Sequence, residues 1–203
     1  MTFAPPARPG PLAAIDIGSN SLRLEVAELT RGKYRRLAYL KETVRMGAGL
    51  DADGRLSEAV MAAGLACLAR FRAALPAHAP VELRAVATQT LREARNRNEF
   101  MRRAHQVLGH PVEVISGREE ARLIYAGVAR LQPSEAPRLV IDIGGRSTEM
   151  ILGRGRTPLR AESFQIGSVG LSLRFFPDGR FTPEAFRAAQ VAAGAELEEG
   201  LSQ

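Results

Sequence analysis

Apolar residues recur along this chain in two rhythms that predict alternating strands and helices. Short apolar runs bounded by Gly, Pro, Asn or Asp are typical of buried strands, whereas apolar residues spaced three and four apart predict amphipathic helices. The first 131 residues begin with a hairpin at 14–26. After it we expect, in order, strand, helix, strand, helix, strand and helix, at 33–44, 57–76, 81–87, 90–109, 112–115 and 116–131. In the helix at 90–109, residues 96–98 are a candidate break. This order predicts a mixed sheet covered by helices.

Three of these helices carry recognisable start signals. Ser57 is a suitable N-cap, because its hydroxyl can accept a hydrogen bond from the first turn. Thr90 and Glu93, and again Ser116 and Glu119, have the spacing of a capping box. In that motif the Ser or Thr caps the helix and the Glu folds back onto the N–H of the cap.

The second half of the chain repeats the beginning of the first. Residues 14–26 and 140–152 align without a gap, and identical pairs occupy five of seven consecutive positions: Ile15/Ile141, Asp16/Asp142, Ile17/Ile143, Gly18/Gly144 and Ser21/Ser147. Each copy is a buried strand ending in an acid, a turn of small residues and a second strand. Further strands are predicted at 139–143, 148–153 and 159–166. A helix is predicted at 182–199, with Thr182 as its cap and Pro183 at its first position. The chain therefore contains two related lobes.

The predicted fold is α/β, with duplicated lobes of mixed β-sheet flanked by helices, the second lobe being truncated. We divide the chain into a disordered N-terminal segment at 1–11, a first lobe at 12–131, a linker at 132–137 and an incomplete second lobe at 138–203. The second lobe lacks a strand, a helix, a strand and a helix, so the chain is either a fragment or a protein with a reduced lobe. Its unfinished sheet edge predicts aggregation or pairing, as in a homodimer.

The composition excludes fewer classes of function than the repeat does. The 203 residues, 45% hydrophobic and 25% charged, are typical of a globular protein. A net charge of +6 is compatible with an anionic partner without identifying one. The absence of Trp and of any DNA-reading motif argues against nucleic acid. We expect a cytoplasmic protein without a membrane partner, because there is no signal peptide, no apolar run of ~20 residues and only one cysteine, Cys67.

Four blocks of sequence carry a family resemblance. They are IDIGSNSLRL at 15–24, ATQTLREARN at 87–96, ISGREEARLIY at 115–125 and VIDIGGRSTE at 140–149. In this order they resemble the signature blocks of exopolyphosphatases and guanosine pentaphosphate phosphohydrolases, the Ppx/GppA phosphatases. The paired loops resemble those of the wider actin, hexokinase and Hsp70 superfamily, which hold phosphates and metal. The resemblance implies ribonuclease H-like, actin-like lobes, Mg²⁺ or another divalent cation, and inorganic polyphosphate or guanosine pentaphosphate as substrate.

The two Gly-rich turns are the candidate phosphate-binding loops. Their backbone N–H groups and hydroxyls can converge on one anion. An ordinary hairpin turn explains either loop alone, but the duplication favours a phosphate cradle. The candidates are Gly18, Ser19, Asn20 and Ser21 in the first loop and Gly144, Gly145, Arg146 and Ser147 in the second.

Three arginines are candidates for gripping phosphate, with a solvated surface role as the alternative. Arg23 and Arg92 fall inside family blocks beside a loop or a helix start. Arg146 departs from the family, in which this position is usually Gly or Ala. A long cation there either grips an additional phosphate or blocks the site.

Four acids are candidates for the chemistry. Asp16 and Asp142 end strands at the mouths of the loops, where they either hold Mg²⁺ beside phosphate oxygens or cap the turns; Glu149 is a weaker third ligand. Glu120 lies in the first turn of a helix, where the macrodipole favours its ionised form. The resemblance assigns the catalytic base to the acid before Ala-Arg-Leu, which is Glu120 here.

These residues predict an exopolyphosphatase that hydrolyses the terminal phosphoanhydride bonds of inorganic polyphosphate and releases orthophosphate. One alternative is a guanosine pentaphosphate 5′-phosphohydrolase that uses the same machinery. Another is a catalytically silent fragment that binds polyphosphate or a nucleotide, an alternative supported by Arg146 and the truncation.

Overall fold

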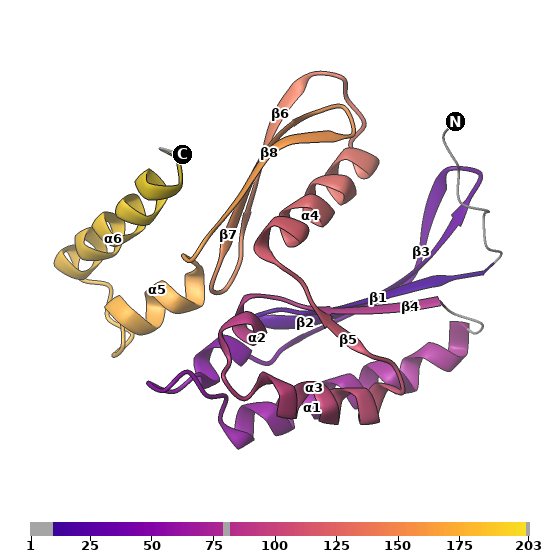
Figure 1. Ribbon diagram of the computed structural model, residues 1–203, viewed down its shortest axis with the longest axis horizontal. Coiled ribbons are helices and arrows are strands. Elements are labelled where there is room, and N and C mark those ends of the chain that lie inside the picture. Colours follow the sequence, from indigo (N-terminus) through magenta and orange to yellow (C-terminus); the bar gives the residue numbers. More distant parts are fainter. Residues whose placement is uncertain (1–9, 79–81, 202–203) are drawn as a thin grey trace.

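The chain forms two lobes connected by the helix α4 (Gly117–Leu131), as the computed structural model in Figure 1 shows for residues 10–78 and 82–201. Most of the predicted disordered segment, residues 1–9, lies outside the described residues. The repeat aligned from the sequence supplies the opening hairpin of each lobe.

The first lobe is built on a five-stranded mixed sheet in the order β3-β2-β1-β4-β5. Its strands are β1 (Leu12–Ile17), β2 (Ser21–Thr30), β3 (Lys33–Thr43), β4 (Glu82–Ala87) and β5 (Val112–Val114). The pairs β1–β2 and β2–β3 are antiparallel, whereas β1–β4 and β4–β5 are parallel. The predicted mixed sheet is therefore confirmed.

One face of this sheet forms the main hydrophobic core. Because side chains alternate along a strand, Ile15, Ile17, Leu22 and Leu24 share this face, and each is at most 2% exposed. They are covered by two helices that lie together on one side of the sheet (Figure 1), α1 (Glu58–Ala74) and α3 (Arg97–Leu108).

The helix α1 is unusually apolar. With the following 3-10 turn η2 it covers Glu58–His78, which by length and composition is long and apolar enough to cross a membrane. The expectation that the chain has no apolar run of ~20 residues is therefore wrong for this segment. One side of α1, including Leu68 and Phe71, packs into the core of the first lobe. Ser57 caps this helix as predicted, since its hydroxyl accepts from the N–H of Val60 at 3.4 Å.

The second lobe contains a three-stranded antiparallel sheet in the order β6-β7-β8. Its strands are β6 (Pro137–Ile143), β7 (Thr148–Arg154) and β8 (Thr157–Phe164). Although α4 directly follows the first sheet in the chain, it packs on this second sheet, where Tyr125 and Ile151 are fully buried. The other face of the sheet leaves Ile141 and Ile143 exposed, although their repeat equivalents in β1 are buried.

Two predicted capping boxes are wrong in part. The short helix α2 (Gln89–Glu93) starts after Thr88, so Thr90 lies inside it; the Thr90 hydroxyl instead donates to Oγ of Ser19 at 2.8 Å. Ser116 does cap α4, but the carboxylate of Glu119 pairs with Arg122 rather than folding back. In both cases a predicted side chain of the capping box bonds to another side chain instead.

Two elements near the loops were not predicted. They are the 3-10 turn η1 (Met46–Gly49) and the helix α5 (Ser168–Phe175). The last helix, α6 (Pro183–Leu201), begins as predicted after Thr182, whose hydroxyl accepts from the N–H of Ala185 at 3.2 Å.

Candidate active site

The two Gly-rich turns have the same backbone geometry and meet each other. The N–H of Gly18 donates to the carbonyl of Ser21 at 3.2 Å, and the N–H of Gly144 donates to the carbonyl of Ser147 at 2.9 Å. A Cβ atom on Gly145 would lie only 3.1 Å from the backbone nitrogen of Asn20. Glycine at 145 therefore allows the loop of the second lobe to approach that of the first.

Neighbouring segments hold both loops by their carbonyl groups. The Ser19 carbonyl accepts from the N–H of Gly47 in η1 at 2.8 Å, and the Gly145 carbonyl accepts from Val169 in α5 at 2.8 Å. In a trans peptide the N–H points opposite to the carbonyl. The N–H group of Asn20, which lines the space between the loops, thus faces away from η1, an arrangement that suits an anion there.

A cavity of about 80 Å³ lies between the loops. It is lined by Ser19, Asn20, Gly144 and other loop residues, and also by charged side chains from both lobes: Asp16, Arg23, Glu120, Asp142 and Glu149. The turns that line this space can donate backbone N–H groups to an anion, so the space suits a phosphoryl group. The structure therefore brings the predicted loops and all four predicted acids to one place.

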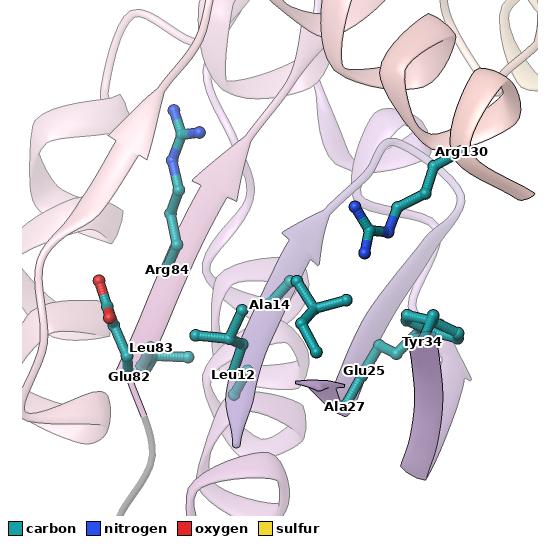
Figure 2. A pocket seen from close by; sticks show the side chains of 11 residues that line it. Leu12, Ala14, Glu25, Ala27, Tyr34, Glu82, Leu83, Arg84 and Arg130 are labelled. Atoms are coloured by element: carbon teal, nitrogen blue, oxygen red, sulfur yellow. The ribbon is translucent and has the colours of Figure 1, made fainter. Parts of the chain in front are cut away.

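A larger cavity of about 410 Å³ lies elsewhere, on the face of the first sheet opposite α1 and α3. Figure 2 shows its lining, in which Leu12, Ala14 and Leu83 lie at the sheet surface and Arg130 reaches over from α4. Neither Gly-rich loop contributes to it. The smaller cavity is accordingly the candidate active site.

Glu120 is the most strongly perturbed acid in this site. Burial raises its pKa from the ordinary 4.5 to about 7, and the carboxylates of Glu149 and Asp16 add to the increase. Arg92 opposes it by donating from Nη1 to Oε2 of Glu120 at 2.8 Å. Only 15% of the Glu120 side chain is exposed. A carboxyl with this pKa is partly ionised near neutral pH and can accept a proton from water.

The neighbouring acids are also shifted toward the neutral form. Burial raises the pKa of Asp16, with Asp142 adding to the increase and Arg23, 3.4 Å away, opposing it. Burial likewise raises the pKa of Glu149, although the hydroxyl of Ser163 donates to it at 2.8 Å. Burial is the main cause in each case, and the neighbouring carboxylates add to it. A divalent cation would stabilise the ionised forms of these acids.

The acids do not form a complete metal cage. Within residues 10–78 and 82–201 there is no group of three His, Cys, Asp or Glu side chains that could hold one ion. Glu149 is buried and already accepts from Ser163, whereas Asp16 and Asp142 line the cavity with their loops. This suits Mg²⁺, which is commonly held by one or two carboxylates together with water and substrate phosphates. As metal ligands these residues remain predictions.

The three candidate arginines have different surroundings. Arg23 lines the cavity, in agreement with contact to a phosphate. Arg92 lies outside the lining residues and holds Glu120. The guanidinium of Arg146 leaves its own loop and pairs with Glu93 of the first lobe at 2.7 Å. The residues around Arg146 in the sequence do not predict that its side chain points toward Glu93.

Sequence reasoning also missed two residues beside the site. Thr88 lines the cavity and follows β4, where its N–H donates to the carbonyl of Ile17 at 3.3 Å. Gln89 is 6% exposed and accepts from Arg92. Their position at the carboxyl end of a parallel strand was the available signal, because ligands commonly bind at such ends in α/β sheets.

Comparison with known proteins finds relatives of one family. A sequence model of the Ppx/GppA phosphatase family matches residues 25–203. A Haemophilus influenzae protein provisionally named an exopolyphosphatase is 43% identical over 188 residues, which cover 93% of this chain and 58% of that protein.

Two solved structures resemble nearly the whole fold. An exopolyphosphatase-like protein superposes with a TM-score of 0.89 at 28% identity, covering 96% of this chain and 62% of that one. The Aquifex aeolicus PPX-GPPA enzyme superposes with a TM-score of 0.76 at 31% identity, covering 94% of this chain and 64% of that one. The expected α/β fold of duplicated, actin-like lobes is confirmed. The chain spans about three fifths of the length of these relatives.

Proposed function

The chain belongs to the Ppx/GppA phosphatase family, and from this premise we propose that the cavity between its loops hydrolyses the terminal phosphoanhydride bond of inorganic polyphosphate. The observation that carries the proposal is the composition of the cavity. Two anion-binding turns and Arg23 line the same small space as Glu120, the partly buried acid with a pKa of about 7.

The loops and Arg23 hold the terminal phosphoryl group. Backbone N–H groups and hydroxyls bind its oxygens without the mobility of long side chains, which favours a fixed orientation. The small cavity accepts a chain end and leaves the rest of the polymer outside. Attack is therefore directed to the terminal phosphorus.

Glu120 acts as the general base. Its carboxylate accepts a proton from a water molecule whose oxygen attacks the terminal phosphorus, as the bond from that phosphorus to the bridging oxygen breaks. The products are orthophosphate and a polyphosphate shorter by one phosphate. Arg92, bonded to Glu120 at 2.8 Å, keeps the carboxylate oriented.

Asp16 and Asp142 are the residues that would hold Mg²⁺, with Glu149 as a weaker third ligand. When bound, the ion supplies charge neutralisation for the phosphate oxygens. The excess of carboxylates around the cavity is the structural reason for assigning it here.

Phosphate release from long-chain polyphosphate with Mg²⁺ tests the proposal. The wild type is compared with Glu120→Ala and with Glu119→Ala, a neighbour whose carboxylate pairs with Arg122 outside the cavity. We expect release to disappear only in Glu120→Ala. Phosphate release from guanosine pentaphosphate but not from polyphosphate would identify the nucleotide as the substrate. Polyphosphate binding without phosphate release would identify a catalytically silent binding module.

A further inference from the structure

The side chain of Arg146 crosses from the second loop into the first lobe. Its Nη2 and Nε atoms lie 2.7 and 2.9 Å from Oε2 of Glu93, and Nη1 donates to the carbonyl of Gly47 at 3.2 Å. Its stem lies so close to Gly47 that a Cβ atom there would be 2.7 Å from Cδ of Arg146. The guanidinium is therefore held by the first lobe through several bonds of fixed geometry.

Glu93 connects this arginine to a buried amide. The second carboxylate oxygen of Glu93 accepts from Nε2 of Gln89 at 2.6 Å. At its other end, the Gln89 amide oxygen accepts from Nε and Nη2 of Arg92 at 2.9 and 2.6 Å. Both ends of the amide are engaged, so Gln89 fixes Arg92 relative to Glu93.

Arg92 completes the connection to the candidate base. Its Nη1 donates both to Oε2 of Glu120 at 2.8 Å and to the carbonyl of Ile115 at 2.9 Å. These side chains are mostly shielded, since 19% of Arg92 and 15% of Glu120 are exposed. In such surroundings hydrogen bonds polarise and orient one another. A continuous series of bonds thus runs from the second phosphate loop to Glu120.

We propose that Arg146 is a positioning residue for hydrolysis, which orients Glu120 through Glu93, Gln89 and Arg92. This inference rests on the proposed function, because it takes Glu120 as the base. Arg146 comes from the loop of the second lobe, whereas Glu93, Gln89 and Arg92 all come from α2 of the first. The series is complete only while the two loops are together, so the base is correctly placed only in the closed site.

Two other roles of Arg146 give different results. A residue that grips phosphate would mainly change KM, but Arg146 does not line the cavity. A residue that merely fastens the lobes together would change stability and leave the turnover of folded protein unchanged. A positioning residue lowers kcat, because the misplaced base acts only after substrate is bound.

The experiment measures kcat and KM for polyphosphate in Arg146→Met, which keeps the apolar stem, in Glu93→Gln, and in the double variant. Glu93→Gln breaks the same link without changing the loop. It therefore still tests the proposal if Arg146→Met fails to fold. The matched control is Arg70→Met, which removes an Arg–Glu pair within the first lobe that connects α1 to Glu42 of β3.

We expect kcat to fall about tenfold or more in each single variant, with KM changed less than about twofold. The double variant should be no slower than the slower single variant, because both changes break one series. The control should keep the wild-type kcat.

Three outcomes would overturn the role of Arg146: unchanged kcat in folded variants, a change confined to KM, or independent losses that multiply in the double variant. A wild-type chain that releases no phosphate would overturn the proposed function and this role together. An active wild type with a fully active Arg146→Met would overturn this role alone.

Discussion

The charge on Glu120 should reduce the stability of the folded chain, and replacing it with Gln should reveal by how much. Raising the pKa of a carboxyl from 4.5 to about 7 means that its ionised form is disfavoured in the folded protein. At about 1.4 kcal/mol for each tenfold change in proton affinity, the cost is roughly 3 kcal/mol. Glutamine is neutral, has nearly the same shape, and still offers an oxygen to Arg92.

The direction of the pH dependence follows from linkage. The folded protein binds this proton more tightly than the unfolded chain, so the contribution of Glu120 is most favourable below pH 4.5 and is lost as the pH rises to about 7. Glu120→Gln should therefore have wild-type stability near pH 4.5 and be more stable by up to about 3 kcal/mol at pH 8.

Urea unfolding in the presence of a chelator, at pH 4.5 and pH 8, measures this difference. The control is Glu119→Gln: because Arg122 and then Arg84 hold the pKa of Glu119 below its usual range, this variant should not be stabilised at pH 8. A Glu120→Gln protein that is less stable than wild type at pH 8, or whose advantage does not vary with pH, would refute the reasoning. The same variant should lose phosphate release, because an amide cannot accept the proton.

Three further predictions concern packing, metal and substrate. Gly153→Ala should lower the free energy of unfolding in urea by about 1–3 kcal/mol, because its Cβ would lie 2.3 Å from buried Tyr125. Gly127→Ala should instead stabilise α4 by about 0.5–1 kcal/mol, because nothing lies within 4 Å of its Cβ. Mg²⁺ should raise the Tm of the wild type more than that of Asp142→Asn, and equal shifts would contradict its role as a ligand. Affinity for long polyphosphate should fall steeply with added salt, as for other polyanions, and a salt-insensitive affinity would exclude charge as its main source.

The local sequence determined the parts of the fold that depend on neighbouring residues. The short apolar runs at 14–26 marked the hairpin of β1 and β2 as a pair of strands, and Ile15 and Leu24 are fully buried in it. The repeat identified both Gly-rich turns, since the same short turn needs the same small residues. Ser57 and Thr182 marked helix starts because a cap acts on its own first turn.

Only the tertiary structure decided which distant groups meet. The carbonyls of Gly144 and Gly145 hold the N-terminus of α5. Residues 168–175 alone therefore do not predict where this helix begins. The direction of Arg146 depends on Glu93, 53 positions away along the chain. The raised pKa of Glu120 likewise arises from burial and from the acids of both lobes. Sequence patterns record local preferences, whereas hydrogen bonds and charge interactions between distant segments exist only once the two lobes are packed together.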